Sequence, residues 1–305
     1  MTSSQHHFRF AVQGGPFRDA RALAEHARRV ESLGYDELYS ADHIGGIDPF
    51  VPLVVAAAAT DDLRVGPLVL NNELHHPVLL ARTAASVDLL CGGRLVLGLG
   101  TGYDEFEHES IGSPIRAPGA RVSRFAESLA ALRSLLDTGE AHVDGEHLRL
   151  AVDALGVGPA AMHVPFLIGG NGRRVVGLAA RYADIFQFTG LVHGEGGRPM
   201  GTGFAIDRLA ERARWLSEDA GERDAEIERS ALVQVVSIDG SGPAVDELGD
   251  VGPPEVLAET PFVLIGSVGA IVDKLWMLRD RLGITHYVVR DPEAFAPVVA
   301  ALRGV

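Results

Sequence analysis

Short apolar runs alternate with helical patterns along nearly the whole chain. Each apolar run has the length of a buried strand, and the following segment repeats apolar residues with the spacing of an amphipathic helix. The predicted strands are 8–13, 37–40, 63–70, 94–99, 164–169, 183–188, 231–238 and 285–290, and the predicted helices are 19–33, 49–60, 77–90, 119–137, 173–182, 204–219, 268–282 and the end of the chain. Eight strands that each precede a helix favour a (β/α)8 barrel, a TIM-like α/β fold, over an open sheet.

Three connections are longer than a normal strand-to-helix loop: 103–118, 189–203 and 239–266. Because they begin after strands, we expect them as insertions on the C-terminal face of the barrel, where such barrels carry their sites. The glycine-rich segment 189–203 is either a surface loop or a lid over substrate, and its residues do not separate the two. We expect a short hairpin over 139–150, outside the barrel, and a single domain over 1–305.

The chain has 305 residues and a formal net charge of −14, and no basic cluster interrupts its acidity. A nucleic-acid backbone is therefore disfavoured as a partner. No apolar stretch is long enough to span a bilayer, and the first residues lack the basic and apolar regions of a secretory signal. We expect a cytoplasmic protein that acts on a small molecule, with no membrane or nucleic-acid partner.

Cys91 is the only cysteine and Lys274 the only lysine. A single cysteine excludes an internal disulfide and a multi-cysteine zinc site. Lys274 lies in a predicted helix with a charged outer face, which disfavours Schiff-base and pyridoxal chemistry. Adjacent histidines such as His75 and His76 rarely converge on one ion, so we expect no metal site.

Asp42 and His43 directly follow the second predicted strand. Side chains alternate along a strand, so one of the two is expected to face the barrel mouth, while the other fixes the loop or orients its neighbour. A histidine at the carboxyl end of a barrel strand is a candidate for acid–base chemistry. His43 is therefore the first candidate for proton transfer.

The stretch 63–102 has unusual residues at both of its strand ends. Pro67 interrupts the third strand, so we expect a bulge or an irregular bend there. Asn71 and Asn72 then either read the edge of a flat heterocycle or cap the turn before the next helix. The sequence GLGTG ends the fourth strand with no helix directly behind it, so it is a weak dinucleotide fingerprint, but its glycines allow a planar ligand close to the backbone.

The segment 168–174 joins the fifth predicted strand to the fifth predicted helix. Backbone N–H groups are free at the helix N-terminus, and Arg173 and Arg174 stand beside them. This arrangement favours a phosphate-bearing cofactor, and the alternative is a tight turn without a ligand.

Taken in order, these stretches resemble the luciferase-like flavin and deazaflavin oxidoreductases. The resemblance is carried by LGYDELYSADH, LRVGPLVLNN, HPVLLARTAASVDLLCGGRLVLGLGTG, PFLIGGNGRRVVGLAARYAD and GITHYVVRD, which run through nearly the full chain. The branch it resembles most is the actinobacterial coenzyme F420-dependent one. The resemblance implies a TIM-like barrel, often a homodimer, with a planar flavin or deazaflavin across the barrel mouth.

The resemblance also implies positions within the site. It places a non-prolyl cis peptide at Leu68–Val69, in a bulge behind the central ring of the cofactor. Together with the residues already singled out, the expected cofactor contacts are Leu68, Val69, Asn71, Asn72, Thr101, Gly102, Gly169, Gly170, Asn171, Gly172 and Arg173. The expected catalytic residues are His43, Asp42 and Tyr103, and the expected substrate-side residues are Gln13, Phe188 and Thr189.

Tyr103 departs from the family pattern. Some deazaflavin dehydrogenases, sugar-phosphate oxidisers among them, carry a catalytic glutamate directly after the Thr-Gly pair that precedes this position. A phenol could donate a proton or stack on a ring, but it does not replace a carboxylate base, so sugar-phosphate oxidation is disfavoured. Glu105 and Glu107 lie close by in the sequence.

The resemblance therefore implies an F420-dependent oxidoreductase that transfers hydride between the deazaflavin and a small organic substrate, by reducing a C=C, C=N or C=O bond or by the reverse reaction. An FMNH2-dependent luciferase-like monooxygenase is the first alternative, because F420 and FMN share the ribityl-phosphate unit. A non-catalytic flavin-binding paralogue is the second, and Tyr103 keeps it open.

Overall fold

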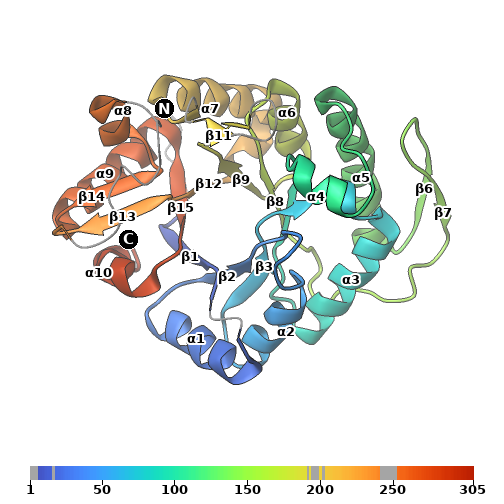
Figure 1. The fold of residues 1–305 in the computed structure, drawn as a ribbon, viewed down its shortest axis with the longest axis horizontal. Coiled ribbons are helices and arrows are strands. Elements are labelled where there is room, and N and C mark those ends of the chain that lie inside the picture. Colours follow the sequence, from blue (N-terminus) through green and yellow to red (C-terminus); the bar gives the residue numbers. More distant parts are fainter. Residues whose placement is uncertain (1–5, 16–17, 191, 194–198, 201–202, 241–252) are drawn as a thin grey trace.

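The computed structural model describes residues 6–15, 18–190, 192–193, 199–200, 203–240 and 253–305. Its centre is a ring of parallel strands with helices on the outside (Figure 1). The strands of the ring are β1 (Arg9–Gln13), β2 (Glu37–Ser40), β3 (Arg64–Pro67), β4 (Leu70–Asn71), β5 (Leu97–Gly100), β8 (Phe166–Gly169), β9 (Ile185–Phe188), β12 (Glu228–Leu232) and β15 (Ile284–Val289). Their order is β3-β2-β1-β15-β12-β9-β8-β5-β4.

The two ends of this order are two pieces of one chain segment. β3 pairs with β2, β4 pairs with β5, and the cis peptide Leu68–Val69 lies between the two pieces. Val65 of β3 also bridges to Leu95, just ahead of β5, so the sheet is nearly closed into a barrel. The nine strands therefore correspond to the eight predicted ones. The irregular bend expected at Pro67 and the cis peptide expected at Leu68–Val69 are both confirmed.

The outer helices follow the apolar periodicity of the sequence. They are α1 (Ala20–Ser32), α2 (Val51–Ala58), α3 (Pro77–Leu90), α5 (Pro118–Thr138), α6 (Arg173–Tyr182), α7 (Ile206–Ala220), α9 (Val268–Leu282) and α10 (Pro292–Leu302). Several of these helices begin at a side-chain cap. In α1 the carboxylate of Asp19 accepts from the Ala22 N–H, and in α9 the hydroxyl of Ser267 accepts from the Ala270 N–H. None of the helices in the described ranges is long and apolar enough to cross a membrane.

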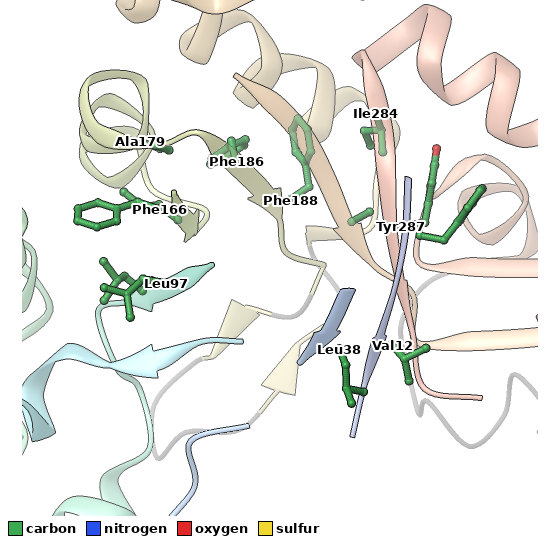
Figure 2. Close-up of a cluster of buried hydrophobic side chains, with 14 of the residues drawn as sticks. Val12, Leu38, Leu97, Phe166, Ala179, Phe186, Phe188, Ile284 and Tyr287 are labelled. Atoms are coloured by element: carbon green, nitrogen blue, oxygen red, sulfur yellow. The ribbon is translucent and has the colours of Figure 1, made fainter. Parts of the chain in front are cut away.

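The larger hydrophobic core lies between the strands and the helices. Figure 2 shows part of it, with Phe166 of β8 and Phe186 of β9 near Ala179 of α6, and Phe188 further along β9. A second, smaller cluster contains the alternate residues of the same strands, among them Leu167. This alternation puts one side chain toward the helices and the next toward the inside of the barrel.

The seventh barrel strand was predicted at 231–238, and this boundary is wrong. The barrel strand is β12, and the apolar run at its end belongs to β13 (Val235–Ile238), which pairs with β14 (Val263–Gly266) in a separate small sheet. The reason is that β12 begins with two charged residues that the barrel buries or pairs. Arg9 neutralises Glu228, and Asp224 neutralises Arg229.

The long connections contain short elements that the sequence did not predict. α4 (Glu105–Ser110) lies in the first of them and α8 (Pro254–Glu259) in the third. The hairpin predicted at 139–150 is confirmed as β6 (Ala141–Asp144) and β7 (Arg149–Val152). In the second connection only β10 (Val192–His193) and β11 (Pro199–Met200) are described beyond its ends, so the question of a lid falls largely outside the described residues. Short 3-10 turns cover Asn72–Leu74 and Gly221–Ala225.

Candidate active site

A cavity of about 550 Å³ opens at the carboxyl ends of the barrel strands. Every strand of the barrel contributes to it through its last residues or the loop behind it. The lining residues are Gln13, Ala41, Asp42, His43, Leu68, Val69, Leu70, Asn71, Gly100, Thr101, Gly102, Tyr103, Asp104, Glu107, Arg121, Gly169, Gly170, Asn171, Gln187, Thr189, Gly190, Leu232, Gln234 and Arg290. Most of the residues predicted from the sequence are therefore brought together at one cavity.

His43 is paired with a carboxylate that the sequence placed only nearby. Its Nδ1 lies 2.6 Å from Oε1 of Glu107 on α4. The His43 side chain is about half exposed (53%), whereas that of Glu107 is buried (6%). Because an ionised carboxylate can only accept, Nδ1 carries the proton in this contact and Nε2 is the atom left for exchange with a ligand.

α4 begins after Asp104, whose side chain caps its N-terminus. The Asp104 carboxylate accepts from the N–H groups of Phe106 and Glu107 at 2.9 and 3.3 Å. An acidic cap followed three residues later by a glutamate is a helix-start pattern. This pattern was the sequence signal that could have revealed both the helix and Glu107.

Asp42 ties two strand ends together. Its Oδ2 accepts from the backbone N–H of Asn71 and lies 2.9 Å from Nε2 of His75. Asp42 and His43 both line the cavity, so the expectation that only one of them faces the barrel mouth is not confirmed. Asp42 fixes the loop, and His43 makes the contact with Glu107. We assign Asp42 a positioning role for this reason.

Both polar atoms of the Asn71 side chain have partners. Its Oδ1 accepts from the Glu73 N–H at 3.0 Å, and its Nδ2 lies 3.2 Å from Nε2 of the buried His108 on α4. A Cβ on Gly102, whose φ is +75°, would lie 2.0 Å from Asn71 Oδ1. Asn71 therefore caps the turn and also lines the cavity. Asn72, in contrast, is buried away from it, with its carbonyl accepting from Arg124.

The floor of the cavity is the bend between β3 and β4. The carbonyl of Leu68 accepts from Nε2 of Gln13 at 2.6 Å, and the Leu68 N–H donates to Ser40 at 2.7 Å. A Cβ on Gly98 would lie 2.0 Å from the carbonyl oxygen of Pro67. Only glycine lets the next strand approach the bend this closely.

The glycine turn after β8 forms one wall through Gly169, Gly170 and Asn171. Gly172 caps α6 and Arg173 begins it, and neither lines the cavity. The guanidinium of Arg173 makes a two-pronged ion pair with Asp219 on α7 instead, which raises the pKa of Arg173 and lowers that of Asp219. The structure thus does not bring Arg173 to the expected phosphate position.

Arg121 is the arginine that lines this side of the cavity. It lies in the first turn of α5, and its Nη1 donates to the carbonyl of Arg116 at 2.7 Å. Its side chain and the start of α5 offer positive charge beside the glycine turn. Sequence reasoning passed over Arg121 because it looked only at the helix that follows β8.

Tyr103 lines the cavity beside His43. The two rings meet edge to face, with centroids 6.5 Å apart. Burial, together with the charges of Asp104 and Glu107, raises the pKa of the Tyr103 phenol. At neutral pH the phenol keeps its proton, so it can donate a hydrogen bond to a ligand but does not act as a base.

Of the predicted substrate-side residues, two line the cavity and one does not. Gln13 and Thr189 line the cavity. Phe188 is fully buried among the side chains that face the helices, because the alternation of β9 turns Gln187 to the cavity instead. Gln234 and Arg290 complete this side, and the sequence analysis did not single them out.

The site fits a planar cofactor that carries a phosphate. Its volume lies within the range of small-molecule sites. Four glycines of the lining (Gly100, Gly102, Gly169 and Gly170) lie at strand ends, where the backbone is open to a flat ring. In the described ranges no group of three or more His, Cys, Asp or Glu side chains is arranged to hold a metal ion.

Residues 2–268 match the model of the luciferase-like monooxygenase family, and the chain belongs to this family. An F420-dependent glucose-6-phosphate dehydrogenase from Beutenbergia cavernae is 27% identical over 90% of this chain and 88% of its own length. A 5,10-methylenetetrahydromethanopterin reductase from Archaeoglobus fulgidus is 28% identical over 58% of this chain, and the match spans only about half (51%) of that relative.

Solved structures show the same fold across the whole chain. An F420-dependent secondary alcohol dehydrogenase, in complex with an F420-acetone adduct, has a TM-score of 0.76 at 16% identity, covering 98% of this chain and 100% of the other. A long-chain alkane monooxygenase has a TM-score of 0.76 at 15% identity, covering 98% and 92%. The chain thus has the same fold as these enzymes.

Proposed function

We propose that this chain is a coenzyme F420-dependent oxidoreductase that transfers hydride between the deazaflavin and a small organic substrate. The bond reduced is C=C, C=N or C=O, or the reaction runs in reverse. The observation that carries the proposal is the His43–Glu107 pair beside a glycine-lined cavity with a bent floor. The full-length relative from Beutenbergia cavernae, named as an F420-dependent dehydrogenase, supports the choice of cofactor.

The floor and two walls of the cavity are proposed to hold the cofactor. The ring would lie against Leu68 and Val69, with Thr101 and Gly102 at its side. The phosphate would lie at the turn after β8, and we propose Arg121 as its arginine in place of Arg173. The residues of the turn are Gly169, Gly170 and Asn171.

When bound, the deazaflavin supplies or accepts the hydride. The protein then has to supply or remove one proton at the substrate. His43 Nε2 is the proposed atom, and Glu107 holds the imidazole in one tautomer and stabilises its charged form. The Tyr103 phenol is a second donor on the same side. A carbonyl reduced by hydride at carbon thus receives its proton at oxygen from a group already aimed into the cavity.

The test is consumption of reduced F420 in the absence of oxygen, with a panel of activated alkenes, imines and ketones. Reduced F420 should be oxidised by at least one acceptor, and His43→Ala should lower the rate about 10²–10⁴-fold while the affinity for F420 stays nearly unchanged. Unchanged turnover in the variant would remove His43 from the mechanism. Turnover only with reduced FMN and oxygen would favour a monooxygenase, and binding of neither cofactor would favour a non-catalytic protein.

We also propose a cytoplasmic homodimer. The support for the dimer is the outer surface of α2 and α3, two neighbouring helices that expose Val51, Leu79 and Leu90 at 59%, 53% and 71%. α2 contains no charged residue, which is unusual for a helix facing water. Light scattering should give twice the chain mass, and Leu79→Glu should shift it toward the monomer.

A further inference from the structure

The wall formed by β12 and β15 holds an arginine that the proposed chemistry does not use. Arg290 directly follows β15, and Gln234 follows its neighbour β12. Nη1 of Arg290 donates to Oε1 of Gln234 at 3.1 Å, and Nε2 of Gln234 donates to the carbonyl of Leu232 at 3.1 Å. All three residues line the cavity. A neutral amide therefore orients this guanidinium at the cavity wall.

Among the residues that the structure describes, Arg290 has no carboxylate partner, whereas several other arginines do. Arg9 pairs with Glu37 and Glu228, Arg173 with Asp219 and Arg229 with Asp224. Within the described ranges no acidic side chain lies within 4.0 Å of the Arg290 guanidinium, and desolvation lowers its pKa without an opposing charge. A guanidinium at a cavity wall with unused N–H donors is a site for a carboxylate or a phosphate.

The position of Arg290 separates it from the phosphate wall. In the barrel order β15 lies opposite β5, whose following segment leads to α5 and Arg121. On the other side β15 is separated from β2, and thus from His43, only by β1 with Gln13. An anion held by Arg290 would lie on the same side of the cavity as the proton-transfer group.

We propose that Arg290, oriented by Gln234, binds an anionic group of the substrate, so that the substrates are small organic acids or phosphate esters. The inference rests on the proposed function, because the proposed function assigns the wall with Arg121 and the turn after β8 to the cofactor. The anion would be anchored at β15 and the reacting bond would lie toward His43. Carboxylate and phosphate share this chemistry, and the experiment has one arm for each.

The experiment measures the binding of benzoate, phenyl phosphate and the neutral analogue benzamide by calorimetry, to protein with and without bound F420. The variants are Arg290→Gln, Arg290→Lys and, as a matched control, Arg82→Gln on the exposed face of α3. Wild type and the control should bind at least one of the two anions about tenfold or more tightly than benzamide. Arg290→Gln should lose that preference, and Arg290→Lys, which keeps the charge, should retain part of it.

Three results would overturn the inference: equal binding of the anions and benzamide, an unchanged preference in Arg290→Gln, or loss of F420 binding in that variant, since Arg290 would then serve the cofactor. The arm without cofactor keeps the two proposals apart. If F420 does not bind the wild type but the anion preference still depends on Arg290, the cofactor proposal fails and the anion site stands. Which anion binds more tightly decides between acids and phosphate esters.

Discussion

Nδ1 of His43 lies 2.6 Å from Oε1 of Glu107, although the two residues are 64 positions apart in the chain. The contact joins the loop behind β2 to α4, which lies beside α5 at the edge of the ring (Figure 1). A charge-assisted hydrogen bond of this kind fixes which ring nitrogen faces the substrate. Glu107 thus brings a carboxylate to the cavity that Tyr103 also lines, four positions after the place where some deazaflavin dehydrogenases are expected to carry a glutamate.

Glu107→Gln should lower kcat about tenfold or more while the dissociation constant for F420 changes little. The amide can still accept from Nδ1, but it no longer stabilises the charged imidazole. Glu105→Gln, on the exposed face of the same helix, is the control and should behave as wild type. If His43 and Glu107 act as a unit, the double variant His43→Ala with Glu107→Gln should have a kcat little below that of His43→Ala alone. Additive losses in kcat would contradict the pairing.

Gly102→Ala should weaken F420 binding about tenfold or more. The new Cβ would lie 2.0 Å from Asn71 Oδ1 and would push that amide out of place. Gly112→Ala is the matched control, because its φ is +69° and a Cβ there meets nothing within 4 Å. Both variants carry the same backbone penalty of about 1–2 kcal/mol, so only the contact differs. Equal F420 affinities of the two variants would show that Asn71 does not shape the cofactor site.

Glu37→Gln should destabilise the fold by about 3–5 kcal/mol. Glu37 is fully buried inside the barrel, where Arg9, Arg64 and His286 surround its carboxylate. Urea unfolding at pH 7 measures the loss. The exposed Glu25→Gln, which breaks a surface pair with Arg21, should cost less than about 1 kcal/mol.

The same residue predicts a pH dependence. Burial alone would raise the pKa of the Glu37 carboxyl, but the charges of Arg9 and His286 outweigh it and hold the pKa well below the ordinary value of 4.5. The folded protein then keeps the carboxylate ionised at a pH where the unfolded chain takes up a proton. The stability contributed by Glu37 is full above about pH 4.5 and is lost as the pH falls through the folded pKa. The difference between wild type and Glu37→Gln should therefore shrink in acid, and a constant difference would contradict the assignment.

Lys274 should titrate near pH 8. Its Nζ donates to the carbonyls of Leu257 and Val263, and burial lowers its pKa from the ordinary 10.5 to about 8. As the only lysine, it gives a single side-chain signal in a protein labelled with ¹³C-lysine, so the midpoint can be read directly. A midpoint near 10.5 would contradict the prediction.

The lowered pKa of Lys274 also sets the direction in which the free energy of unfolding changes with pH. Between about pH 8 and 10.5 the unfolded chain holds this proton and the folded protein does not, so the free energy of unfolding rises with pH in that window. The rise should be at most about 3 kcal/mol and should be absent in Lys274→Met. Urea unfolding of both proteins at pH 7.5 and 10 measures it.

The sequence was sufficient for the barrel because strands and helices alternate with distinct periods almost throughout. The boundary of β12 was missed because Glu228 and Arg229 look exposed in the sequence, and their partners lie on other elements. Pro67 was enough to predict an irregular bend, whereas the cis peptide at Leu68–Val69 was expected only from the resemblance.

The candidate site was predictable where function follows strand ends and was missed where it depends on tertiary contacts. His43, Thr101 and Gly169 stand directly at or after strands, and all three line the cavity. Arg173 does not line the cavity, because its guanidinium forms an ion pair with Asp219, 46 positions later in the chain. Glu107 reaches the cavity only through the folding of α4. Arg290 directly follows β15 and was open to the same strand-end argument, although it was not singled out.

The most direct test of the central claim is a parallel titration of the purified protein with F420 and with FMN, followed by the absorption and fluorescence of the bound species. The account predicts stoichiometric binding of F420 that is at least about tenfold tighter than that of FMN, and a similar F420 affinity in His43→Ala. Tighter binding of FMN, or no binding of F420, would contradict it.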